Sequence, residues 1–124
     1  MSATDLLVWG VFAHLVADWI LQNDWIAVNK DNLKHSAAWL HGFIHFMSQV
    51  PVFGGMWQWH LGTLVALILA LVHMGIDTRK PRDWWMDLLG QTSDGIVGVI
   101  VCLAVDQVMH IMCIAIAALM VASM

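Results

Sequence analysis

The sequence contains no glutamate and no tyrosine, and only 11% of its 124 residues are charged, against 60% that are hydrophobic. With a mean hydropathy of +0.76, the chain is too apolar for a water-soluble enzyme of this size. Lysine and arginine together number five and the formal net charge is −4, so the chain offers no basic surface to nucleic acid. These shortages indicate a membrane protein whose first partner is the lipid bilayer.

Cysteine is also scarce, since Cys102 and Cys113 are the two in the chain and lie in one apolar stretch. On a helix that rises about 1.5 Å per residue they are roughly 16 Å apart, which is too far for a disulfide between them. The first apolar stretch follows Asp5 rather than a basic segment, so we expect no cleavable signal peptide. The small size predicts a single transmembrane helical domain over residues 1–124.

Four apolar stretches predict an all-α, polytopic membrane protein built as a four-span helical bundle. The predicted spans cover residues 5–22, 37–53, 60–78 and 96–122. The basic residues fall in two of the three connections, which contain Lys30 and Lys34, and Arg79, Lys80 and Arg82. Four spans place these two connections on one side of the membrane, and the positive-inside rule makes that side cytoplasmic. We therefore expect the cell inner membrane, with both chain ends on the periplasmic side.

The second and third connections carry structural signals of their own. The second is short and typical of a turn at the outer interface, with Gly54, Gly55, Trp57 and Trp59. The run from Pro81 to Leu89 predicts a short interfacial helix before the last span. Because a helix from Ile96 to the C-terminus would be about 43 Å long, we also expect a bend or a buried interfacial start around Gly95 to Gly98.

Eight ionisable residues lie well inside the predicted spans and form pairs with i, i+4 spacing. The pairs are His14 with Asp18, His41 with His45, His73 with Asp77, and Asp106 with His110. Side chains four positions apart lie on one face of an α-helix, so every span presents one polar edge. Three pairs fall in the cytoplasmic half of their spans, and the fourth joins them if the last crossing begins near Val99 to Cys102.

The cost of burying these carboxylates indicates that something compensates them. An aspartate at the centre of a spanning helix costs about 2.5 to 3.5 kcal/mol, and three unpaired ones would cost on the order of 7 to 10 kcal/mol. Hydrogen bonds to histidine, a water-filled cavity or a metal ion can offset this cost. Eight donors exceed the three or four that one zinc ion takes from protein, so we expect one or two divalent ions. Histidine nitrogens and aspartate oxygens suit Zn, Fe or Mn, and these donor types do not distinguish the three metals.

The four pairs are also compatible with roles that need no divalent ion. A buried histidine is often only a hydrogen-bonded core residue, and His–Asp chains also serve as proton relays in transporters. Axial ligation of haem by two histidines is a further alternative, which the paired aspartates disfavour. Among the remaining polar residues, we expect Gln107 to face away from Asp106 and bond a neighbouring helix. Gln22, Asn23 and Asp24 are expected to cap the end of the first span.

The motifs, taken in order, resemble a known family. They are His14-Leu-x-x-Asp18-Trp-x-Leu-Gln22 with Asn29-Lys30 after it, His41-x-x-x-His45, His73-x-x-Ile-Asp77, and Asp106-Gln107-x-x-His110. Over most of the chain this set is similar to the bacterial and phage membrane proteins of the domain-of-unknown-function 3307 family. A looser similarity exists to membrane-bound metal-dependent hydrolases, which also carry His and Asp motifs on spanning helices. The resemblance implies a polytopic metal-binding membrane protein and supplies no substrate.

Two functional hypotheses follow. The first is a metal-dependent hydrolase in which the ions held by the eight paired residues activate a water for attack on a phosphoester or lipid-like substrate. An Asp or His outside the ligand set would act as the base. The second is a non-enzymatic membrane subunit whose metal or His–Asp network is a structural clasp, within a homo-oligomer or a larger membrane complex.

Overall fold

The computed structural model describes residues 1–55 and 59–124, and this part of the chain consists of helices and short connections, without strands. The elements are α1 (Ala3–Leu15), η1 (Val16–Ile20), α2 (Asp24–Asn29), α3 (Ser36–Gln49), η2 (Val50–Gly54), α4 (Trp59–Asp77), α5 (Lys80–Leu89) and α6 (Gly95–Ala122). The predicted all-α class is confirmed. Trp57, which we assigned to the outer turn, lies outside the described residues.

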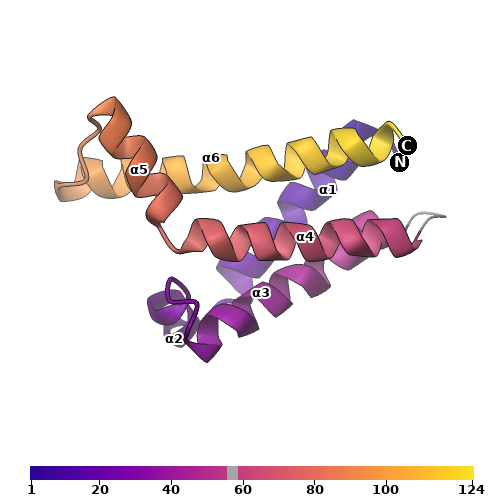
Figure 1. Ribbon diagram of the computed structural model, residues 1–124, viewed down its shortest axis with the longest axis horizontal. Coiled ribbons are helices and arrows are strands. Elements are labelled where there is room, and N and C mark those ends of the chain that lie inside the picture. The colour runs from indigo at the N-terminus through magenta and orange to yellow at the C-terminus, as the bar shows by residue number, and fades with distance from the viewer. Residues whose placement is uncertain (56–58) are drawn as a thin grey trace.

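The four long helical segments pack against one another in a bundle. α1 contacts α3 and α6, and α4 contacts α3 and α6, so each segment has two neighbours. The two chain ends lie together at one end of the molecule, and α2 and α5 lie at the other end (Figure 1). Because Lys30 ends α2 and Arg79 precedes α5, the two basic connections share the same end of the bundle.

Three helical segments are long and apolar enough to cross a membrane, namely Ala3–Ile20, Trp59–Asp77 and Gly95–Ala122. Large apolar side chains are exposed along their outer faces, as at Val8 and Ile100. A water-soluble protein rarely exposes apolar surface on this scale, and these helices therefore indicate a membrane protein.

The second predicted span is helical but differs from the other three. It forms α3 and continues into η2, and it carries three buried polar side chains, those of His41, His45 and Gln49. These residues lower its hydropathy, and it is not among the segments long and apolar enough to cross a membrane. The count of four spans therefore stays a prediction.

The start of the last helix differs from the expected bend. α6 runs without interruption from Gly95 to Ala122, and the change of chain direction comes at Gly95 itself, where φ is +66°. Glycine takes this left-handed conformation without the steric cost that a Cβ imposes, so the chain turns at the first residue of α6 and the helix itself does not bend. The first residues of α6 are exposed rather than buried, and the short helix expected before it is present as α5.

Side-chain caps define where the early helices begin. Ser2 and Asp5 form a capping box, in which Asp5 N donates to Ser2 Oγ at 3.1 Å and Ser2 N donates to Asp5 Oδ2 at 2.9 Å. We expected Asn23 to cap the end of the first span, but it does not. Its Oδ1 accepts from Ile26 N at 2.9 Å and so begins α2, a short helix that the sequence analysis missed.

Two of the segments contain a π-helical turn. In η1 the widened turn holds Asp18, and Leu21 N donates to Val16 O at 2.9 Å. In η2 it contains Pro51, which lacks an N–H for the regular α-helical bond. Single π turns inside helices are rare and occur frequently at functional sites. The turn at η1 therefore marks Asp18 as a candidate functional residue.

The core nearest the chain ends is apolar and closely packed. Its buried members include Leu6, Phe53 and Ile114, from α1, η2 and α6. A Cβ built at Gly62 would meet the Phe53 carbonyl, and one at Gly10 would come within 2.7 Å of Ile114 Cγ2. Small residues at such positions let helices approach closely, which is the main source of helix association within a bilayer.

Candidate metal centre

The four i, i+4 pairs converge in the half of the bundle toward α2 and α5. Asp18 comes from η1, and the other paired residues come from α1, α3, α4 and α6. The side chains of all eight except Asp106 are buried, with exposed fractions of 5% or less. The pairing pattern therefore predicted a real cluster of side chains that are far apart in the sequence.

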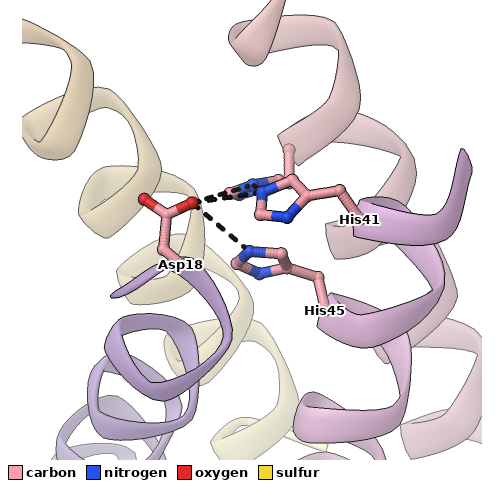
Figure 2. Close-up of side chains that lie close together, drawn as sticks. Asp18, His41 and His45 are labelled. Carbon is pink, nitrogen blue, oxygen red and sulfur yellow. Dashed lines mark hydrogen bonds and ion pairs between the residues drawn. The ribbon is translucent and has the colours of Figure 1, made fainter. Parts of the chain in front are cut away.

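The first group of potential ligands surrounds one carboxylate oxygen. Ligand atoms of Asp18, His41, His45 and His73 all lie within 4.8 Å of one another. The distance from Asp18 Oδ1 to the histidine Nε2 atom is 3.1 Å for His41, 3.7 Å for His45 and 3.8 Å for His73. Figure 2 shows the Asp18 carboxylate facing His41 and His45 across the space between their helices.

The spacing of these atoms suits a common metal ion. In a tetrahedral site with bonds of about 2.0–2.2 Å, neighbouring ligand atoms are about 3.3–3.6 Å apart. The distances above bracket this value, and His41 Nε2 and His73 Nε2 are 3.0 Å apart. Imidazole nitrogens that point at each other can share at most one hydrogen bond, whereas a cation between them would use both lone pairs.

A second group shares one member with the first. It consists of His73, Asp77 and His110, again with ligand atoms within 4.8 Å of one another. Asp77 Oδ2 is 3.0 Å from His73 Nε2, and Asp77 Oδ1 is 3.6 Å from His110 Nε2. Because His73 belongs to both groups, the arrangement can hold one ion with partners around it or two neighbouring ions.

Several of these atoms are buried without a hydrogen bond. They include His45 Nε2, His110 Nε2 and Asp77 Oδ2. His110 Nδ1 lies 2.9 Å from the carbonyl oxygen of Asp106 and must donate to it, which leaves the Nε2 lone pair directed at Asp77. A histidine held in this way through one nitrogen is the usual arrangement of a metal ligand. The residues present therefore fit a divalent ion.

Two predicted ligands lie beside the groups rather than in them. His14 Nε2 is 3.2 Å from Gln107 Oε1, an acceptor only, so this nitrogen carries the proton and is not free to bind a metal. The His14 ring stacks on that of His110, with centroids 5.0 Å apart. Asp106 Oδ2 is 3.6 Å from His110 Nδ1, and its side chain is 18% exposed.

Lys30 is a member of the cluster that the sequence analysis did not identify. We considered it only as a charge that sets topology, but the turn after α2 carries it back over the site. Its Nζ lies 2.9 Å from Asp18 Oδ1, 3.5 Å from Asp77 Oδ2 and 3.4 Å from His41 Nε2. The occurrence of Asn29-Lys30 within the family motif was the one available signal.

Gln107 and Gln49 complete the polar interior. Gln107 Nε2 donates to Asp18 Oδ2 at 3.1 Å and to Asp106 Oδ2 at 3.3 Å. The expected interhelical bond is therefore present, but Gln107 faces the cluster and not away from it. Gln49 is buried, and its Nε2 donates to the Gly10 carbonyl at 3.0 Å, which links α3 to α1.

Two cavities adjoin the cluster. A small one of about 20 Å³ is lined by His14, His45, His73 and His110 together with Gln49, and it has room for about one water molecule. A larger one of about 360 Å³ lies toward α5 and is bordered by all three paired aspartates, Asp18, Asp77 and Asp106. Carboxylates of both ligand groups therefore border open space.

The comparisons with known proteins agree with the resemblance of the motifs. No curated protein and no solved structure matches the chain. The looser similarity to membrane-bound metal-dependent hydrolases has no support among these findings. A family model described as "Protein of unknown function (DUF3307)" matches residues 6–124, and the chain therefore belongs to the DUF3307 family.

Proposed function

We propose that this protein is an integral membrane metal-dependent hydrolase that acts on a phosphoester or lipid-like substrate. The observation that carries the proposal is the larger cavity, because it opens onto Asp18 and Asp77, one carboxylate from each potential ligand group. A structural metal site is closed by its protein ligands, whereas a catalytic site keeps a position for water or substrate. A cavity at the ligands favours the second kind.

Charge balance supports a divalent ion at this place. With neutral imidazoles, the three paired aspartates and Lys30 leave a formal charge of −2 in the cluster. One divalent cation would neutralise it, and a membrane interior strongly disfavours uncompensated charge. We therefore favour one ion at the shared His73, with Asp18 and His45 of the first group or Asp77 and His110 of the second around it. A second ion in the other group is the alternative.

The chemistry we propose is the addition of water across a phosphoester bond. A divalent ion lowers the pKa of a bound water to about 7, which makes it a nucleophile at neutral pH. Asp106 borders the cavity, is partly exposed and lies outside both ligand groups, so it is our candidate base. Asp106 takes a proton from the attacking water, the P–O ester bond breaks, and the protonated Asp106 then returns that proton to the leaving alkoxide.

A structural clasp is the second candidate function, and Lys30 is the observation that favours it. Its ammonium lies within 3.5 Å of both Asp18 and Asp77, so the network has a cation of its own. A proton relay is less consistent with the structure. The buried polar residues of the described chain all belong to the cluster or to Gln49 beside it, and none continues toward the chain ends.

We further propose that the end carrying α2 and α5 faces the cytoplasm, with the chain in the cell inner membrane. The five basic residues of the chain lie in the two connections at this end. The positive-inside rule then assigns the chain ends to the periplasm. The cluster would be reached from the cytoplasmic surface.

Elemental analysis of detergent-purified protein tests the metal, with wild type compared against His45→Ala and Asp77→Asn. Asp87→Asn is the matched control, since Asp87 is an exposed acid on α5. We expect about one Zn, Fe or Mn per chain in wild type and in the control, and less than a tenth of that in the site variant whose residue belongs to the occupied group. Wild type without stoichiometric metal would favour the structural clasp, in which Lys30 supplies the cation beside the aspartates.

Hydrolysis is tested on the same preparations with p-nitrophenyl phosphate and bis(p-nitrophenyl) phosphate. We expect release of p-nitrophenol that is abolished by chelation and by Asp106→Asn, while Asp106→Asn keeps its metal. Metal without any hydrolysis of either ester would argue for the clasp. Activity that survives chelation would contradict the proposed mechanism.

A further inference from the structure

We propose that the larger cavity binds the phosphate-type anionic head of an amphiphile, with Arg79 and Arg82 as its cationic contacts. The inference rests on the proposed function, because it names the class of substrate that would meet the metal. Its grounds are different, however: they are the charges of the cavity and the apolar side of its mouth rather than the metal ligands.

The cavity lies between η1, α5 and α6 and has two kinds of polar wall. One wall contains the aspartates and Gln107 of the cluster. The other contains Arg79 and Arg82, while Lys30 lies among the aspartates of the first, 2.9 Å from Asp18 Oδ1. Together these cations are three of the five basic residues in the chain, gathered around one space. With a divalent ion bound to the aspartates, the net charge around the cavity becomes positive, as an anion requires.

Both arginines keep donors available for a ligand. Arg79 Nε lies 3.5 Å from Asp31 Oδ2. Arg82 donates from Nε and from Nη2 to Asp83 Oδ1, at 2.9 and 2.7 Å. A guanidinium has five N–H donors, and paired guanidiniums suit the oxygens of phosphate. Arg82 is also the less exposed partner, at 18% for its side chain against 57% for that of Asp83.

The backbone at Arg79 is an independent sign that its position matters. Its φ is +68°, the one positive φ at a non-glycine residue in the described chain. A left-handed conformation is unfavourable for a residue with a Cβ, and glycine would adopt it freely. Non-glycine residues held in this conformation cluster at ligand-binding sites. Here the turn between α4 and α5 brings the guanidinium to the cavity wall.

One side of the mouth of the cavity is apolar, which points to an amphiphile rather than a small hydrophilic ester. Trp19, Val99 and Leu103 border it from η1 and α6, and each of them is more than half exposed. These side chains lie on segments apolar enough to be within the bilayer. A ligand with its anionic head between the arginines could extend a hydrocarbon chain over this surface without leaving the membrane.

Calorimetric titration of the metal-loaded protein with inorganic phosphate tests the head-group site. We compare wild type with Arg79→Gln/Arg82→Gln and with Lys80→Gln. Lys80 is the matched control, since it stands between the two arginines, is exposed and does not border the cavity. We expect the double variant to bind phosphate at least about tenfold more weakly and the control to bind within about twofold of wild type. Equal affinity in all three proteins would overturn the proposal.

A second variant separates ligand binding from folding. Arg79→Gly removes the charge but suits the left-handed backbone, so its thermal stability should equal or exceed that of wild type. We expect it to lose phosphate affinity nonetheless, and Arg79→Lys to retain most of it. Undiminished affinity in Arg79→Gly would show that Arg79 has only a structural role.

Titration with mixed micelles distinguishes a lipid from free phosphate. Phosphatidic acid should bind at least about tenfold more tightly than inorganic phosphate, and phosphatidylcholine should not compete. Equal affinity for phosphatidic acid and phosphate would overturn the amphiphile and leave a site for soluble phosphate compounds. Metal content is measured on every sample. Arginine-dependent binding without metal would refute the proposed function alone, and metal without arginine-dependent binding would refute this inference alone.

Discussion

The two halves of the bundle are built from the same four helical segments, but their interiors have opposite chemistry. Toward the chain ends the interior consists of Leu6, Phe53 and Ile114 with small residues around them. Toward α2 and α5 it consists of histidines, aspartates and Lys30. Gln49, a buried residue of α3 that bonds to Gly10 of α1, lies where the two halves meet.

The difference teaches how a small membrane protein can maintain a polar interior. Burial of apolar side chains away from lipid adds little, so the apolar half depends on close packing and dispersion. The polar half bears the cost of buried carboxylates, about 2.5 to 3.5 kcal/mol each at mid-membrane, and depends on their compensation. Substitutions in the two halves should therefore have different consequences: loss of packing in one, loss of charge balance in the other.

The largest effect is expected from Lys30→Met in protein stripped of metal. The substitution removes the cation beside Asp18 and Asp77, and an uncompensated buried charge costs about 3–5 kcal/mol. A bound divalent ion would supply the missing charge, so the same variant should lose less than half as much stability when loaded. Chemical unfolding in detergent with and without chelator measures both values. An identical loss in the two states would show that no metal shares these carboxylates.

Phe53→Ala should give the next largest effect, in the opposite half. Phe53 is fully buried, and its truncation leaves a cavity of roughly 100 Å³, which costs about 2 kcal/mol at about 24 cal/mol per Å³. Phe53 borders neither of the cavities that adjoin the cluster, so metal content should not change. Unfolding measurements and elemental analysis of the same sample check both points. Loss of metal in this variant would mean that the two halves are not independent.

Much of this contrast could be predicted from the sequence. Long apolar runs predicted the helical segments, and i, i+4 spacing predicted which histidines and aspartates gather in the polar half, because both depend on periodicity within a helix. The boundary of the polar half was harder to predict. Asp106 is only partly buried, because the cavity toward α5 keeps one side of α6 open at that point.

The residues that the sequence analysis missed or misplaced share a cause. Lys30 reaches the cluster only because α2 turns the chain back, and a short helix of this kind has no strong pattern. Gln107 reaches the cluster because α6 packs against α1 and brings it to His14 and Asp18. These are properties of how segments pack, and no single segment encodes them.

A smaller effect is expected from glycine substitutions on α4, one in each half. A Cβ at Gly62 would collide with the Phe53 carbonyl, and such overpacking typically costs about 1–3 kcal/mol. A Cβ at Gly75 meets nothing within 4 Å, and alanine there should stabilise the helix by up to about 1 kcal/mol. Unfolding of Gly62→Ala and Gly75→Ala in parallel measures the difference. Equal effects would contradict the close packing of the apolar half.

The smallest effect is expected from Gln49→Met, which tests where the polar half ends. The variant loses the bond from Nε2 to the Gly10 carbonyl, worth about 1 kcal/mol, but it also removes Oε1, which is buried without a partner. These contributions oppose each other, so stability should change by less than about 1 kcal/mol. Because Gln49 borders the small histidine-lined cavity but its hydrogen bond goes to the Gly10 carbonyl and not to a potential ligand, metal content should also stay constant. A drop in metal content at unchanged stability would place Gln49 inside the polar site, as the partner of a water in that cavity, and would move the boundary one helical turn toward the chain ends.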